Sequence, residues 1–136
     1  MKRVFADTSY FVALLNPGDE YHDAAVELTE TFDGQIVTTS WVLVELGNFL
    51  AGSPNRALLA SLVRTLRASA RTRIVGATER SFHEGLDLYA RRPDKRWSLT
   101  DCMSFTTMRR GRLTAALTTD QHFAQAGFEA LLRRRA

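Results

Sequence analysis

The sequence predicts an α/β fold in which helices cover both faces of a parallel β-sheet. Short apolar runs alternate along the chain with longer segments of helical periodicity, and this alternation is typical of parallel sheets with crossover helices. The length of 136 residues, with 45% hydrophobic and 24% charged side chains, fits one globular domain spanning residues 1–136. Because the strands are short, a helical bundle is the main competing architecture.

The first half of the chain is predicted to form two strands and three helices. The strand 3–6 ends at Asp7, where Thr8 or Ser9 can cap a helix that continues to Leu15. Apolar residues at helical spacing predict a helix over 20–32, and the turn Asp33-Gly34 separates it from a strand over 35–39. Ser40 can cap the third helix, which we expect to end near residue 51 before Gly52-Ser53-Pro54.

The second half continues the same alternation. A leucine- and valine-rich stripe predicts a helix over 58–66, followed by a strand over 73–76 and a helix over 79–90. Ser98 and Asp101 have the spacing of a capping box for a helix that ends near Arg110. The remaining elements are a strand over 113–118, a turn or short helix over 121–126 and a weakly patterned strand over 128–131.

The net charge of +3 is unevenly distributed. Residues 1–50 carry two basic and eight acidic side chains, whereas residues 91–136 carry ten basic and four acidic ones. Basic surface gains affinity for polyanions by releasing counterions, so the second half suggests a nucleic-acid partner. A solvated, arginine-rich surface is the alternative interpretation.

The cysteine content and the hydropathy of the sequence indicate the cellular compartment of the protein. A single cysteine allows no intrachain disulfide, which is consistent with a reducing environment. No apolar run approaches the ~20 residues of a membrane span, and Asp7, Thr8 and Ser9 interrupt the apolar start that would resemble a signal peptide. We therefore expect a cytoplasmic protein without a membrane association.

Most common catalytic motifs are absent. The sequence contains no GxGxxG, Walker A, GxSxG or HExxH pattern. Cys102 has no evident histidine partner and is expected to be a small helix residue. His22, His83 and His122 lack metal-ligand spacing, and we expect surface or capping roles for them.

Four carboxylates are the remaining candidates for chemistry, each with a structural alternative. Asp7 and Asp120 follow predicted strands, and Asp101 lies at the start of a helix, so each could simply cap a helix. Glu45 lies in an apolar helix with Trp41 and Phe49 one turn to either side. A carboxylate in such surroundings is costly unless it is paired or coordinated, but Glu45 could also lie at the edge of the apolar stripe.

The four acids become more informative as a set. Asp7 and Asp120 would end strands at one edge of a parallel sheet, where ligands of open α/β sheets bind, and the helices carrying Glu45 and Asp101 would begin near that edge. Carboxylates gathered there would repel one another without cations, and Mg²⁺ or Mn²⁺ prefers oxygen ligands. A carboxylate-held cation beside basic surface suits hydrolysis of phosphodiesters. The spacing allows this convergence without demonstrating it.

Four segments, in order along nearly the whole chain, resemble the PIN domain and in particular the VapC-type toxins of bacterial toxin–antitoxin pairs. They are Val4-Phe5-Ala6-Asp7-Thr8-Ser9, the helix with Glu45, Trp97-Ser98-Leu99-Thr100-Asp101-Cys102-Met103-Ser104, and Leu117-Thr118-Thr119-Asp120-Gln121-His122-Phe123-Ala124-Gln125-Ala126-Gly127-Phe128. The resemblance implies a three-layer α/β/α sandwich with a mostly parallel five-stranded sheet.

The resemblance also implies an activity. It indicates an endoribonuclease dependent on Mg²⁺ or Mn²⁺, whose catalytic and metal-binding acids are Asp7, Glu45, Asp101 and Asp120. Thr8 and Thr118 match supporting positions. A homodimer held inactive by a VapB-type antitoxin is implied as well. A metal-activated water would leave 3′-hydroxyl and 5′-phosphate ends on the RNA. The candidates for contacts to the RNA backbone are Arg109, Arg110, Arg112 and the tail Arg133-Arg134-Arg135.

Two other functions remain compatible with the sequence. A metal-dependent nuclease acting on DNA or on structured nucleic acid would use the same acids, because contacts to the ribose 2′-hydroxyl cannot be recognised from sequence. A non-catalytic interaction module would use the acids only as helix caps.

Overall fold

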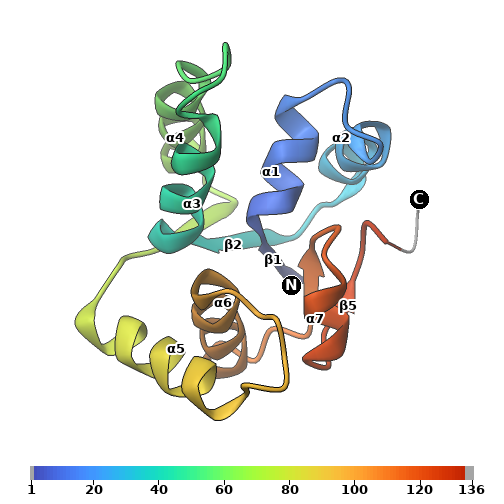
Figure 1. The fold of residues 1–136 in the computed structure, drawn as a ribbon. Helices are drawn as coiled ribbons and strands as arrows, with labels where there is room; N and C mark the ends of the chain where they lie inside the picture. Colours follow the sequence, from blue (N-terminus) through green and yellow to red (C-terminus); the bar gives the residue numbers. More distant parts are fainter. Residues whose placement is uncertain (1, 134–136) are drawn as a thin grey trace.

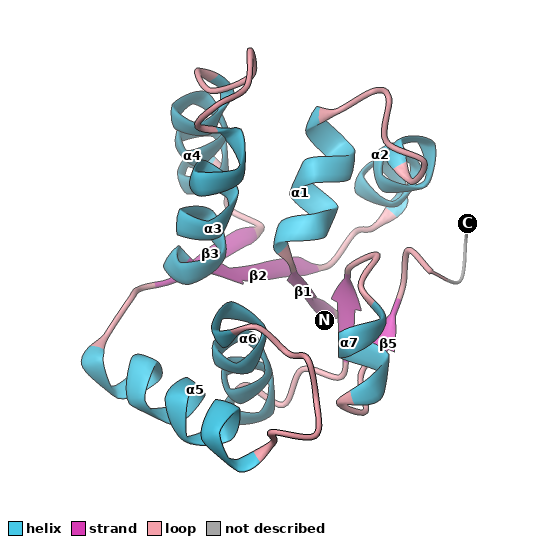
Figure 2. Cartoon of the chain, in the orientation of Figure 1, coloured by secondary structure: helices cyan, strands magenta, loops and turns pink. Residues whose placement is uncertain are grey.

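The computed structural model describes residues 2–133, which contain one five-stranded sheet with every neighbouring pair of strands parallel. The order of strands across the sheet is β3-β2-β1-β4-β5 (Figure 2). Their bounds are β1 Arg3–Ala6, β2 Gln35–Thr39, β3 Thr72–Val75, β4 Ala115–Leu117 and β5 Glu129–Ala130. The chain therefore winds outward from β1 in one direction, returns across the sheet after β3, and winds outward in the other direction.

The helices form a layer on each side of this sheet (Figure 1). One layer contains α1 Thr8–Leu15, α2 His22–Thr31, α3 Ser40–Leu50 and α4 Leu58–Ala68. The other contains α5 Glu79–Arg91 and α6 Leu99–Arg110, which pack along each other, with the short α7 Gln121–Gln125 beside α6. The predicted α/β/α sandwich is confirmed, and the competing helical bundle is excluded.

The core lies around the central strand β1. Phe5 and Ala6 have no exposed surface, because β1 is paired on both edges and covered by helices on both faces. Phe123 of α7 packs 6.3 Å from the ring of Phe5, and Phe105 of α6 meets Phe123 edge to face at 4.8 Å. Such aromatic pairs stabilise a core beyond the burial of their area alone, and here they join the sheet to α6 and α7.

The sequence located every element, and the differences lie in the caps and ends. Asp7 rather than Thr8 or Ser9 caps α1, and Thr39 rather than Ser40 caps α3. In both cases the residue at the end of a buried strand already has the extended backbone that an N-cap requires. The strand expected over 113–118 is shortened to Ala115–Leu117, and β3 begins one residue earlier than expected, at Thr72.

The helices of residues 2–133 can be compared with the requirements for crossing a membrane. None of these helices combines the length and the hydropathy of a transmembrane segment.

The close packing of α5 on α6 depends on Gly85. A Cβ at this position would lie 2.2 Å from the Cγ of Met103 and 3.0 Å from its Cα. We expect Gly85→Ala to lower the free energy of unfolding by about 1–3 kcal/mol, although alanine is the better helix former by about 1 kcal/mol. Urea denaturation measures the difference. Gly52→Ala is the control, since a Cβ there meets no atom within 4 Å, and equal stability of Gly85→Ala and wild type would contradict the prediction.

Candidate active site

The structure brings the four predicted acids to one cleft of about 510 Å³ at the carboxyl ends of the central strands. We call this the acid cleft. Asp7 follows β1 directly, Asp120 follows β4, Glu45 comes from α3 and Asp101 from the first turn of α6. Its complete lining is Asp7, Thr8, Ser9, Val12, Asp19, Glu45, Phe49, Arg96, Ser98, Asp101, Thr119, Asp120 and His122.

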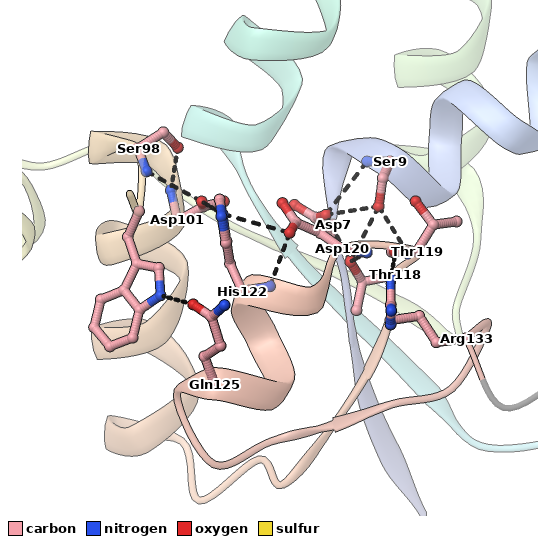
Figure 3. Close-up of polar contacts among 11 residues, drawn as sticks. Asp7, Ser9, Ser98, Asp101, Thr118, Thr119, Asp120, His122, Gln125 and Arg133 are labelled. Carbon is pink, nitrogen blue, oxygen red and sulfur yellow. Dashed lines mark hydrogen bonds and ion pairs between the residues drawn. The ribbon is translucent and has the colours of Figure 1, made fainter. Parts of the chain in front are cut away.

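Asp7 is buried, with 3% of its surface exposed, and two hydroxyl groups bind its carboxylate. Ser9 Oγ donates to Asp7 Oδ2 at 2.8 Å, and Thr118 Oγ1 donates to the same oxygen at 2.9 Å (Figure 3). Burial raises the pKa of Asp7 to about 7, and the charge of Asp101 adds to this rise, whereas the hydrogen bonds from Ser9 and Thr118 oppose it. The carboxylate therefore lacks a compensating positive charge.

Asp101 combines a helix cap with a place in the cleft. Its N–H donates to Ser98 Oγ at 3.0 Å, and its Oδ2 accepts the Ser98 N–H at 3.1 Å, which is the predicted capping box. Burial raises the pKa of Asp101 above its usual range, and the charge of Asp120 acts in the same direction, while hydrogen bonds from His122 and the Ser98 backbone lower it. The cap fixes the carboxylate beside the cleft.

Asp120 and His122 complete this side of the cleft. Asp120 caps α7 by accepting the His122 N–H at 2.8 Å. The His122 ring turns back over this cap, so that its Nδ1 lies 3.0 Å from Asp101 Oδ2 and 3.4 Å from Asp120 Oδ1 (Figure 3). The expected surface or capping role of His122 is thus wrong, because the first turn of α7 places its ring between Asp120, which is two residues away, and Asp101, which is 21 residues away.

Glu45 faces the cleft from the opposite helical layer. It is half-buried, and Phe49, one turn further along α3, is 62% exposed at the same cleft. The core face of α3 is formed by other residues, Val42, Leu43, Leu46 and Leu50. The surroundings of Glu45 are therefore less enclosed than its apolar sequence context suggests, and its carboxylate borders solvent rather than the core.

Thr118 and Ser9 hold the strand ends together beneath the acids. Thr118 is fully buried, and its Oγ1 also accepts the N–H of Asp120 at 3.0 Å. Ser9 Oγ accepts the N–H of Thr119 at 3.0 Å. Thr8 is buried at the same place, and its Oγ1 has no hydrogen-bond partner among residues 2–133. Sequence reasoning missed Ser9, although its position two residues after Asp7 is the usual place for a donor to that carboxylate.

The donor set of the acid cleft fits a divalent cation. Asp101, Asp120 and His122 each offer one ligand atom, and these three atoms lie within 4.8 Å of one another. Asp7 lines the same cleft. Carboxylate oxygens suit Mg²⁺ and Mn²⁺, and a histidine nitrogen is accepted more readily by Mn²⁺. The raised pKa values of Asp7 and Asp101 indicate negative charge that a cation would compensate.

The three arginines predicted to contact RNA lie away from the acid cleft. Arg109 and Arg110 are at the end of α6 opposite to Asp101, and Arg112 lies just beyond them. Arg110 binds the carboxylate of Glu84 at 2.6 and 2.7 Å, and Arg109 lies over the ring of Phe128. None of the three lines the cleft. Of the predicted tail contacts, Arg133 donates to the Thr119 carbonyl at 3.1 Å (Figure 3), and Arg134 and Arg135 fall outside the described residues.

Comparisons with known proteins agree with this arrangement of acids on a parallel sheet. The sequence profile of the PIN domain matches residues 4–129. The chain belongs to the PIN-domain family. A relative within the family is the 23S rRNA-specific endonuclease VapC20 of Mycobacterium tuberculosis, which is 29% identical over 126 residues, 92% of this chain and 95% of the relative.

Solved structures with a similar fold support this arrangement. The crystal structure of VapC20, described as a Sarcin-Ricin loop cleaving toxin, superposes with a TM-score of 0.83 at 27% identity, covering 92% of this chain and 95% of that one. FitAcB from Neisseria gonorrhoeae gives 0.64 at 18% identity, with 93% and 94% covered. VapBC2 from Rickettsia felis, bound to promoter DNA, gives 0.65 at 14% identity, with 95% and 97% covered. These last two similarities show the fold.

The raised pKa of Asp7 predicts how the metal-free protein responds to pH. An unfolded aspartate has a pKa of 3.8 and the folded Asp7 about 7, so between these values the native state keeps a proton that the unfolded state loses. The stability in EDTA should therefore fall as the pH rises from about 4 to 7. An asparagine can still cap α1 but cannot ionise, so Asp7→Asn should reduce this fall to the part that the raised pKa of Asp101 contributes. It should stabilise the protein at pH 8 by up to about 4 kcal/mol.

Urea denaturation in EDTA at a series of pH values measures this effect. Asp87→Asn is the control, because it removes the same charge from an exposed position on α5. Parallel stability profiles of wild type and Asp7→Asn between pH 4 and 8 would show that the burial of Asp7 carries no such cost.

Proposed function

We propose that this chain, as one PIN-like domain over residues 1–136, is a metal-dependent endoribonuclease and the toxin of a VapBC-type toxin–antitoxin pair. The observation that supports this most is the acid cleft itself, in which Asp7, Glu45, Asp101 and Asp120 meet from four different elements of a PIN-domain fold. The similarity to VapC20, named as an rRNA endonuclease, supports RNA rather than DNA as the substrate. Ribosomal RNA is accordingly the first substrate to test.

The proposed cation is Mg²⁺ or Mn²⁺, held by Asp7, Glu45, Asp101 and Asp120. A divalent cation in such a site lowers the pKa of a water molecule and stabilises the charge that develops on the phosphate and the leaving oxygen. Water rather than the ribose 2′-hydroxyl is the proposed nucleophile, which predicts 3′-hydroxyl and 5′-phosphate ends.

The side chains around the acids keep the carboxylates in place for this chemistry. Ser9 and Thr118 fix the orientation of Asp7 through its Oδ2. The capping box and His122 together bind Asp101 Oδ2. The reacting groups of an active site have to be held within fractions of an ångström of their productive positions. We propose that Thr118 and His122 support catalysis by holding the carboxylates of Asp7 and Asp101 in this way. Thr8, with its unpaired and buried hydroxyl, is a further supporting position.

We further propose an antitoxin partner and a homodimer. VapC20 is described as a toxin, and another similar solved structure is described as VapBC2 bound to promoter DNA, which supports a VapB-type partner for this chain. The RNA substrate and such a partner would be met in the cytoplasm. The homodimer follows from the family resemblance and is tested by the mass of the purified protein in solution.

Removing the charge of Glu45 should abolish cleavage while RNA binding is retained. A glutamine at this position keeps the size and one carbonyl oxygen but not the negative charge that binds a hard cation. We expect Glu45→Gln to reduce the cleavage rate of a labelled RNA by about 100-fold or more, which corresponds to ~3 kcal/mol in the barrier. Glu30→Gln on the exposed face of α2 is the control.

Cleavage in Mg²⁺ and gel-shift binding of RNA in EDTA are measured in parallel on these variants. Cleavage by Glu45→Gln within about threefold of wild type would overturn the role of Glu45. Loss of both activities with a lower melting temperature would instead show that Glu45 supports the fold.

Direct metal binding can be measured without RNA. Titration of Mn²⁺ into the wild-type protein by calorimetry should give a saturable heat, because the cation offsets the repulsion among the carboxylates. The double variant Asp7→Asn/Asp101→Asn should bind at least about tenfold more weakly. Equal heats from the two proteins would refute the assignment of the cation to this cleft, and Asp23→Asn/Asp87→Asn is a control with the same change in charge.

A further inference from the structure

A second hollow of about 600 Å³ adjoins the acid cleft, a volume typical of sites for small organic ligands. It lies between the end of α5, the loop 92–98 and the start of α6. Arg96 and Ser98 line both the acid cleft and this hollow. We call it the basic hollow, because Arg92, Lys95 and Arg96 are in its wall and no acidic side chain of the described part of the chain lines it. A ligand that extends out of the acid cleft past Arg96 would enter it.

The loop that presents Arg96 is fixed on both sides. Arg92 binds the carboxylate of Asp94 at 3.0 and 2.9 Å, and its guanidinium lies 5.0 Å from the centre of the Trp97 ring. Trp97 is buried, and its Nε1 donates to Gln125 Oε1 at 3.1 Å. Trp97 also meets Phe105 edge to face at 5.0 Å. Arg96 therefore directly precedes the buried Trp97 and follows a turn closed by the Arg92–Asp94 pair, so it is presented from a defined place.

Arg96 is chemically unusual for its position. Among residues 2–133 it is the one lysine or arginine that lines the acid cleft, which it shares with five carboxylates, those of Asp7, Asp19, Glu45, Asp101 and Asp120. It is exposed, and within residues 2–133 it makes no hydrogen bond or ion pair. A free guanidinium beside an acid cleft is suited to bidentate contact with a phosphate.

Tyr89 supplies an aromatic surface to the same hollow. Half of its surface is exposed, and it projects from the last turns of α5. Single-stranded nucleic acids bind grooves that combine positive charge with aromatic rings on which bases stack. The basic hollow has both features, and it is continuous with the proposed site of cleavage.

We propose that the basic hollow binds the single-stranded RNA nucleotide next to the cleaved phosphodiester, with Arg96 contacting a phosphate and Tyr89 stacking on a base. This inference rests on the proposed function, since it assigns a binding subsite to its substrate. The five acids of the cleft repel a polyanion, so the neighbouring positive wall supplies the attraction that holds the strand across the cleft.

Binding of a fluorescein-labelled single-stranded oligoribonucleotide in EDTA tests the proposal without cleavage. Fluorescence anisotropy is recorded between about 50 and 200 mM salt. We expect Arg96→Gln to weaken binding about tenfold and to reduce the slope of log affinity against log salt by about one. Tyr89→Ala should weaken it about tenfold, whereas Tyr89→Phe, which keeps the ring, should bind within about twofold of wild type.

Arg64→Gln on α4 is the matched control, because it removes the same charge from an exposed position away from both hollows. Equal RNA affinity of Arg96→Gln and Arg64→Gln, or of Tyr89→Ala and Tyr89→Phe, would overturn the proposal. Unchanged RNA binding by Arg96→Gln together with weaker binding of a glutamate-rich peptide would also overturn it, since the hollow would then dock a protein.

A parallel cleavage assay of the wild-type protein in Mg²⁺ separates the two proposals. If the wild-type protein does not cleave RNA but the Arg96 and Tyr89 variants lose RNA binding as expected, the proposed nuclease activity is contradicted. The proposal that the basic hollow binds RNA is then retained. If the wild-type protein cleaves RNA but the Arg96 and Tyr89 substitutions leave RNA binding unchanged, the proposed nuclease activity is retained. The proposal that the basic hollow binds RNA is then overturned.

Discussion

The burial of one carboxylate at the end of the central strand is the constraint on which the site depends. Asp7 follows a strand that is paired on both edges, so its side chain cannot turn to solvent without breaking the cap of α1. Thr118, from the end of the neighbouring strand β4, binds it together with Ser9. The parallel pairing of β1 with β4 therefore determines both the burial of the charge and the hydroxyl groups that partly compensate for it.

Helix capping and the proposed chemistry use the same carboxylates but different oxygens, so they do not compete. Asp7 and Asp120 each cap a helix, Asp101 completes the capping box of α6, and all three line the acid cleft. A cap restricts the side chain to one rotamer near the helix N-terminus, where the backbone N–H groups favour negative charge. The remaining carboxylate oxygens are thereby held facing the cleft. An acid that caps a helix is thus compatible with a metal ligand, and the two interpretations of these residues need not exclude each other.

Side chains of opposite charge around the cleft serve different parts of the proposed function. The acids bind the cation, and the basic residues attract the RNA. The acids of the cleft favour a divalent cation but disfavour a polyanionic substrate, while Arg96 and Lys95 line the adjoining basic hollow. Arg133 is tied to the Thr119 carbonyl on another side of the cleft. The excess of basic residues after position 90 therefore includes side chains beside the site, and not only a solvated surface.

Local interactions made the elements predictable, whereas contacts between distant segments decided the site. The alternation of strands and helices and the Ser98–Asp101 capping box depend on residues a few positions apart, and both could be read from the sequence. The place of Asp7 and Asp120 at one sheet edge followed from the rule for parallel strands. The His122 ring between Asp101 and Asp120, the Thr118 hydroxyl on Asp7 and the place of Arg96 between two hollows depend on strand order and helix packing. These contacts join segments that are up to 111 residues apart, and no local pattern encodes their distances, so only the tertiary structure could establish them.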